Sequence, residues 1–223
     1  MPAQVERIQT GQGNAYVIDS ALDEETLRWI DTFRLSLTLD SKRPTVDRRF
    51  FADGPIQESK GGPAPPYLLS LDPNRPMANV LEVAIQQAMI SSTDQAKFGG
   101  CHVFRYQRFV EYTLVGSKLD PHTDGTKICD DTKKTSTHTL LLYLTDCEVG
   151  GETVLLKECT KDLHPPLVDG SEGRDKDNAV VIYATQPRRG RILLFPHAAP
   201  HAGAMVKSVP KICLRAEISL LGT

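Results

Sequence analysis

Residues 137–156 read THTLLLYLTDCEVGGETVLL, and this stretch decides the fold class. Its two apolar runs, Thr137–Leu144 and Thr153–Leu156, have the length of strands, and the Gly150-Gly151 pair between them is typical of a tight turn. Similar runs, separated by Gly, Pro and Asp, follow one another through the second half of the chain: Cys101–Phe109, Tyr112–Val115, Val180–Tyr183, Arg191–Phe195 and Ile212–Leu221. The pattern indicates an antiparallel sandwich or barrel.

The first half has a different pattern. A strand-like run, Asn14–Asp19, precedes a helix that Ser20 or Asp23 can cap, with apolar residues at helical spacing from Leu27 onward. A second helix is predicted over Pro76–Met89. We therefore expect a mainly β fold with flanking α, a double-stranded β-helix (jelly-roll) core with the N-terminal helices packed on one sheet.

The length of 223 residues suits one domain over residues 1–223. Residues 1–99 are expected to provide helical support and a substrate-rim segment, and residues 100–223 the jelly-roll core with the functional site. Two polar segments are predicted as loops, Gln57–Pro66 and an insertion over residues 159–178.

The composition excludes several classes of function. A formal net charge of −2 argues against nucleic acid and anionic membranes as partners. The chain shows neither a signal peptide nor an apolar run long enough to span a bilayer, so we expect a cytoplasmic or nuclear location. Its five cysteines include no C-x-x-C pair, which favours buried free thiols over disulfides or a thiolate zinc site.

The segment His122-Thr-Asp124 carries the first sign of chemistry. On an extended strand end the two side chains point to the same face. An imidazole and a carboxylate are two of the three ligands in the facial triad that holds iron(II). Of the six histidines, His197 and His201 are the candidates for the third ligand, and spacing alone does not choose between them.

Six motifs occur in order over residues 100–220 and resemble those of one family. They are Phe104-Arg-Tyr106, Gly116–Gly125 around the His-Thr-Asp segment, Leu142–Asp146, Gly150-Gly-Glu-Thr153, Pro187–Phe195 and His201-Ala-Gly203. This series resembles the iron(II)/2-oxoglutarate-dependent dioxygenases, specifically the prolyl 4-hydroxylase-like branch. The ordered set is far more specific than any one motif.

The resemblance implies which side chains form the site. In this family the distal histidine is followed two residues later by Gly, which implies a metal triad of His122, Asp124 and His201, with His197 as a neighbour. A basic residue on the following strand binds the distal carboxylate of 2-oxoglutarate, and both Lys211 and Arg215 qualify. Position +10 after the histidine favours Lys211, whereas Arg215 offers better bidentate geometry.

Three further residues receive cosubstrate-binding roles from the same resemblance. Tyr143 matches a tyrosine that hydrogen-bonds the cosubstrate carboxylate, and Tyr106 matches a tyrosine that lines the pocket. Thr139, four residues before Tyr143 on the same face, could contribute a hydroxyl.

The implied function is hydroxylation of an unactivated C–H bond, with Fe(II), 2-oxoglutarate and O2 as cofactor and cosubstrates and ascorbate as a further candidate. The implied substrate is a prolyl residue in a peptide or protein. The alternatives are the same chemistry on a free amino acid or small metabolite, and a non-catalytic jelly-roll binding module. The fold resemblance does not choose between these substrates, and the oligomeric state is not predicted.

Overall fold

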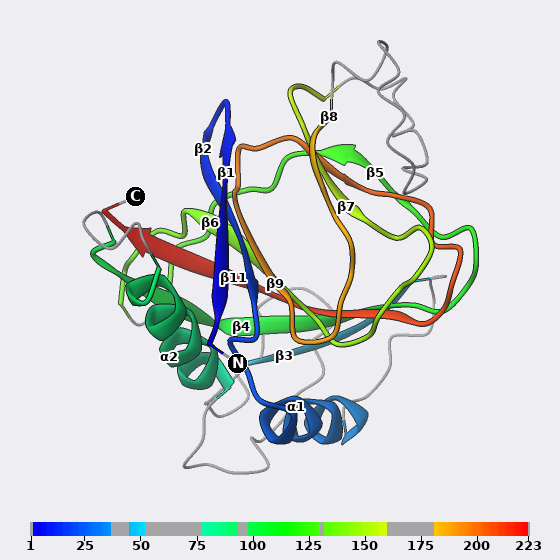
Figure 1. Cartoon of the computed structure of the whole chain (residues 1–223), viewed down its shortest axis with the longest axis horizontal. Helices are drawn as coiled ribbons and strands as arrows, with labels where there is room; N and C mark the ends of the chain where they lie inside the picture. Colours follow the sequence, from blue (N-terminus) through cyan, green and yellow to red (C-terminus); the bar gives the residue numbers. More distant parts are fainter. Residues whose placement is uncertain are drawn as a thin grey trace, which may run out of the picture.

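The computed structural model describes residues 2–36, 45–51, 77–92, 98–129, 132–159 and 181–222. These residues form two antiparallel sheets and two helices (Figure 1). The larger sheet contains, in spatial order, β1 (Gln4–Thr10), β2 (Gly13–Asp19), β9 (Ile192–Pro196), β6 (His138–Tyr143), β11 (Lys211–Leu221), β4 (Gly100–Tyr112) and β3 (Thr45–Phe51). The smaller sheet contains β5 (Leu119–His122), β10 (His201–Gly203), β7 (Thr153–Leu156) and β8 (Val181–Thr185). The predicted mainly β, jelly-roll fold class is confirmed.

Strict alternation of side chains gives the larger sheet two different faces. On β6, Leu140 and Leu142 belong to the main apolar core, while Thr139 and Leu141 line a cavity on the opposite face. Strand β11 follows the same rule: its even-numbered residues from Ile212 to Leu220 join the core, and Lys211, Cys213 and Arg215 line the cavity. One face of this sheet is therefore structural, and the other faces the smaller sheet and carries polar chemistry.

Two helices cover the structural face of the larger sheet: α1 (Glu24–Ser36) and α2 (Met77–Ile90). In Figure 1 both lie away from the strands β5, β7 and β8. Asp23 is the N-cap of α1, because its carboxylate accepts the backbone N–H of Thr26 at 2.7 Å. Glu82 of α2 accepts the backbone N–H of Val103 at 2.9 Å, which attaches this helix to β4. Neither of these helices, at 13 and 14 residues, is long enough to cross a bilayer.

Strand β4 differs from its prediction. The sequence suggested two runs separated near Glu111, whereas β4 is continuous from Gly100 to Tyr112. A charged residue can be buried near the end of this strand because Arg34 of α1 binds the Glu111 carboxylate at 3.0 Å. Tyr112 is consequently the last residue of the same strand.

The N-terminal segment contributes strands to the larger sheet as well as the two supporting helices. Strands β1, β2 and β3 lie within residues 1–99, and β2 pairs with β9 while β3 pairs with β4. The proposed division at residue 99 stays a prediction. The predicted loop Gln57–Pro66 lies outside the described residues, as does the 159–178 insertion apart from Cys159.

Candidate active site

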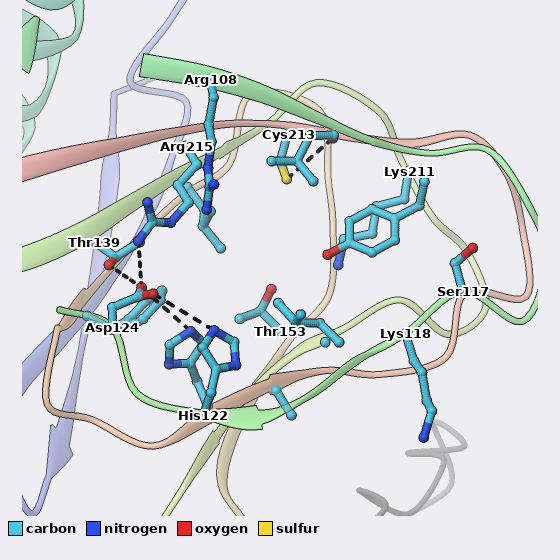
Figure 2. A pocket seen from close by; sticks show the side chains of 18 residues that line it. Arg108, Ser117, Lys118, His122, Asp124, Thr139, Thr153, Lys211, Cys213 and Arg215 are labelled. Carbon is cyan, nitrogen blue, oxygen red and sulfur yellow. Dashed lines mark hydrogen bonds and ion pairs between the residues drawn. The ribbon is translucent and has the colours of Figure 1, made fainter. Parts of the chain in front are cut away.

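A cavity of about 480 Å³ lies between the two sheets. Its walls come from β4, β6, β9 and β11 of the larger sheet and from β5, β7 and β10 of the smaller sheet. Figure 2 shows a cluster of His122, Asp124, Thr139 and Arg215 at one end of the cavity and Lys211 at the other.

His122, Asp124 and His201 come together at one end because β5 and β10 are neighbours. His122 at the end of β5 pairs directly with His201 at the start of β10. The backbone N–H of Asp124 donates to the carbonyl of His197 at 2.9 Å, which places the carboxylate beside both imidazoles. One potential ligand atom from each of the three residues lies within 4.8 Å of the other two.

Backbone carbonyls orient both imidazoles. The Nδ1 atom of His122 lies 2.8 Å from the carbonyl of Asp120, and Nδ1 of His201 lies 3.0 Å from that of Ala199. A carbonyl only accepts hydrogen bonds, so Nδ1 of each ring is a donor and Nε2 is the nitrogen left to bind a metal. Burial lowers the pKa of His201 to about 4, against the attraction of Asp124, so this imidazole is neutral at pH 7.

Two donors bind the same carboxylate oxygen of Asp124. Thr139 donates its hydroxyl to Oδ2 at 2.5 Å, and Nη2 of Arg215 lies 2.9 Å from the same atom. Burial by itself raises the pKa of Asp124, but Arg215, Thr139 and His201 outweigh burial and lower the pKa to about 2. The carboxylate is therefore ionised at every physiological pH.

The cluster fits a divalent transition metal. Two imidazole Nε2 atoms and one ionised carboxylate form the donor set that suits iron(II) in open facial sites. The Nε2 atom of His122 lies 3.8 Å from Oδ1 of Asp124, and Nε2 of His201 lies 3.6 Å from Oδ2, so both imidazoles lie beside the carboxylate. Among the described His, Cys, Asp and Glu side chains, those of His122, Asp124 and His201 form the one group of three or more that lie close enough together to hold a metal ion.

Lys211 marks the opposite end of the cavity. Its side chain is almost fully buried, at 2% exposure, and its ammonium lies 4.7 Å from the centroid of the Tyr112 ring. Burial lowers the pKa of Lys211. Within the described part of the chain, no carboxylate lies within ion-pair distance of this ammonium, which is the environment that an anionic ligand would complete.

Neither of the two predicted tyrosines, Tyr143 and Tyr106, lines the cavity. Tyr143 is fully buried behind the wall and donates its hydroxyl to Thr153, which lines the cavity, at 2.7 Å. Tyr106 does not line the cavity. It lies where the pairing of β4 with β11 is irregular, between Val103 and Gln107, so the regular alternation toward the cavity begins after it.

Tyr112 is the cavity tyrosine that sequence reasoning missed. It lies on the same strand as Tyr106, an even number of residues later, and alternation along one unbroken strand would have identified it. Thr139 and Arg215 do line the cavity, but both contact Asp124. Glu217 was also missed; it binds Nη1 of Arg215 at 2.8 Å.

Comparison with known proteins agrees with this arrangement. The family model described as the 2OG-Fe(II) oxygenase superfamily matches residues 101–216, which is just over half of the chain. A search of curated protein sequences found no match.

Solved structures of low sequence identity share the fold. An oxidoreductase of the 2OG-Fe(II) oxygenase family from Burkholderia pseudomallei has 16% identity and a TM-score of 0.53, over 92% of this chain and 84% of that one. The viral collagen prolyl hydroxylase of Paramecium Bursaria Chlorella virus-1 has 17% identity and a TM-score of 0.51, over 92% and 94%. A non-heme alpha ketoglutarate dependent epimerase from nogalamycin biosynthesis has 10% identity and a TM-score of 0.52, over 92% and 76%.

These neighbours carry out different reactions, so the shared fold does not assign a substrate. The family model, in contrast, matches more than half of the chain, which is enough to assign the family. The chain belongs to the 2OG-Fe(II) oxygenase superfamily, a family of oxidoreductases whose chemistry uses iron(II), 2-oxoglutarate and O2.

Proposed function

We propose that the protein is an iron(II)- and 2-oxoglutarate-dependent dioxygenase that hydroxylates an unactivated C–H bond, with a prolyl residue of a peptide or protein as its substrate. In this proposal His122, Asp124 and His201 bind the metal, and Lys211 binds the distal carboxylate of 2-oxoglutarate. Ascorbate is proposed as an accessory reductant.

One observation carries the proposal: a buried ammonium and a His-Asp-His cluster face each other across one cavity. Lys211 and Arg215 are four residues apart on the same face of β11, which corresponds to about 13 Å along a strand. The cluster and Lys211 are at opposite ends of the cavity, and in this proposal a dicarboxylic acid lies with one end at each. Among the described residues lining the cavity, four are basic and one is acidic, which favours an anionic cosubstrate: Arg108, Lys118, Lys211 and Arg215, with Asp124.

In this proposal the residues of the cavity have three separate roles: they bind the metal, bind the cosubstrate and exclude water. His122, Asp124 and His201 hold iron(II), which supplies the oxidising chemistry together with 2-oxoglutarate and O2. Lys211 neutralises the distal carboxylate, with the Tyr112 ring beside its ammonium. Leu141 and Phe195 give the cavity wall apolar surface, with the Phe195 ring beside that of His201, and exclude water from that part of the site.

The proposed prolyl substrate rests on the position of the cosubstrate lysine, ten residues after His201 as in the prolyl 4-hydroxylase-like branch. A free amino acid or small metabolite is the second candidate. Within the expected substrate-rim segment, residues 1–99, the side chains of residues 45–51 lie outside the described residues. Substrate choice is therefore left to a direct assay.

The first experiment tests the cofactors. Purified protein mixed anaerobically with iron(II) and 2-oxoglutarate should develop a weak visible charge-transfer band, and admission of O2 should produce succinate. The His201→Ala variant is the control and should give neither signal. Absence of both signals from the wild-type protein would show that it is a non-catalytic binding module.

The second experiment tests the substrate. Prolyl peptides and free amino acids are incubated separately with the loaded enzyme, with and without ascorbate, and products are examined by mass spectrometry. The proposal expects a peptide product that has gained one oxygen atom on proline. A product only from a free amino acid would overturn the prolyl assignment while leaving the dioxygenase assignment intact.

A further inference from the structure

We infer that Arg215 is a positioning residue for the metal ligand Asp124, and that together with Thr139 it leaves Oδ1 as the metal-binding oxygen. This inference rests on the proposed metal site. It separates the roles of the two basic residues on β11, because Lys211 serves the cosubstrate whereas Arg215 serves the metal ligand.

Two carboxylates bind the guanidinium of Arg215. Nη2 binds Oδ2 of Asp124 at 2.9 Å, and Nη1 binds Oε1 of Glu217 at 2.8 Å. Arg215 and Glu217 are two residues apart on β11, so both side chains leave the same face of the strand. The guanidinium is thus held from both sides by carboxylates, and Figure 2 shows it directed at Asp124 and away from Lys211.

The second donor to Asp124 is Thr139. Its hydroxyl donates to Oδ2 of Asp124 at 2.5 Å and lies 3.0 Å from Nδ1 of His197. Because the hydroxyl has a single proton, Nδ1–H of His197 is the donor in the second contact. The other ring nitrogen of His197 lies 2.7 Å from the hydroxyl of Ser136, which keeps this ring in place.

Arg215 and Thr139 therefore bind the same oxygen, and each has its own buried anchor, Glu217 or His197. The anchors are 2% and 3% exposed. Strand pairing makes the arrangement rigid, because Glu217 of β11 is directly opposite Thr139 of β6. The Oε2 atom of Glu217 lies 3.3 Å from Nε2 of His197 without the geometry of a hydrogen bond, so the two anchors are also neighbours of each other.

The consequence concerns the metal. Two strong donors on Oδ2 oppose rotation of the carboxylate and reduce the ability of Oδ2 to bind a cation. Hydrogen bonds that hold a ligating carboxylate typically contribute about 10- to 100-fold to metal affinity or activity. Arg215 should therefore affect the metal before any cosubstrate is present, which Lys211 should not.

The test compares cobalt(II) binding to the full chain without 2-oxoglutarate, by calorimetry and by the visible spectrum of the bound ion. Arg215→Lys keeps the positive charge but removes the fork, so electrostatic repulsion of the metal is unchanged. We expect about 10- to 100-fold weaker binding and an altered spectrum. Arg191→Lys is the matched control: its fork binds Asp19 at 2.8 and 2.7 Å, outside the cavity, and metal affinity should be unchanged.

A second pair of variants avoids any change of charge. Thr139→Val removes the hydroxyl with almost the same shape and should weaken cobalt(II) binding, whereas Thr139→Ser keeps the hydroxyl and should restore it. This pair also decides the matter if Arg215→Lys does not fold. Equal losses in the Val and Ser variants would overturn the hydrogen-bonding role.

The outcomes distinguish the inference from the function on which it rests. Wild-type protein that binds no cobalt(II) would contradict the proposed metal site itself. Wild-type binding together with unchanged affinity in Arg215→Lys, and a higher requirement for 2-oxoglutarate, would make Arg215 a cosubstrate ligand and overturn the inference alone.

Discussion

A single side chain, Lys211, shows how the site depends on burial. An ammonium at 2% exposure with no carboxylate partner among the described residues costs stability, because the charge has lost its water. The Tyr112 ring offsets a part of that cost through its π face. Such an arrangement is favourable only when an anion completes it, which is the physical basis for the cosubstrate assignment.

We predict that Lys211→Met raises the KM for 2-oxoglutarate about 10- to 100-fold, because a charge-assisted hydrogen bond is lost. Without cosubstrate the variant should unfold at the same or a higher urea concentration than the wild-type protein, since a costly buried charge has gone. Lys207→Met removes an exposed lysine outside the cavity; it is the control and should change neither quantity. An unchanged KM in Lys211→Met would contradict the assignment.

At the scale of elements, the two faces of the larger sheet have different roles. The face covered by the helices contributes to stability, and the opposite face lines the cavity. Helix α1 contributes Leu27, Ile30 and Phe33 to the core on the face of the larger sheet that is turned away from the cavity. Arg189 fastens this helix to the sheet, because it binds Asp31 at 2.8 Å and the carbonyl of Leu144 at 2.6 Å. Changes in the helix should therefore affect unfolding much more than metal binding.

We predict that Asp23→Ala lowers the free energy of unfolding by about 1 kcal/mol, because the N-cap of α1 is lost. Cobalt(II) affinity should stay at the wild-type value. Asp23→Ser retains an oxygen that can accept the N–H of Thr26 and should recover most of the stability in urea titrations. A large loss of metal affinity in Asp23→Ala would show that α1 and the site are coupled.

At the scale of the whole molecule, buried histidines govern the response to acid. Burial lowers the pKa of His138, and lowers those of His197 and His201 to about 4, below the ordinary value of 6.5. The unfolded chain therefore binds protons first as the pH falls, so this contribution is complete above about pH 6.5 and is lost toward pH 4. Burial raises the pKa of Glu217, so this carboxyl favours the folded state as the pH falls. It is a single group, whereas three histidines favour the unfolded state.

We accordingly predict that the metal-free protein is less stable at pH 5 than at pH 7, by on the order of 2 kcal/mol or more in urea unfolding. His138→Gln should reduce this difference, because it removes one buried titrating ring that lies outside the cavity. Equal or greater stability at pH 5 would contradict the prediction.

Metal binding should stabilise the whole fold, because its ligands come from two strands of the smaller sheet that are far apart in sequence. At a free cobalt(II) concentration about 100 times its Kd, we predict a gain of about 2.7 kcal/mol. His201→Ala should abolish the gain. His102→Ala removes a half-buried histidine that contacts Glu82 outside the cavity, and this variant should keep the gain. A cobalt(II) effect that persists in His201→Ala would place the metal elsewhere.

Much of this protein was determined by its sequence alone. The β-rich runs after Gly100 predicted the jelly roll, and helix α2 begins and ends within one residue of its predicted bounds. Local periodicity is enough for such elements, because alternation and helical spacing depend on neighbours in the chain. The ordered motifs likewise indicated His122, Asp124 and His201, which the fold brings together.

Only the tertiary structure decided how the remaining site residues are used. Arg215 lies beside Asp124 and Lys211 does not, although both face the cavity from one strand, because the two residues are four positions apart along β11. Tyr112 lines the cavity because strand β4 continues through Glu111, whose charge is balanced by Arg34 from a helix 77 residues earlier, and Tyr106 does not because the pairing of β4 with β11 is irregular there. Such outcomes depend on contacts between distant segments, and local sequence patterns do not contain that information.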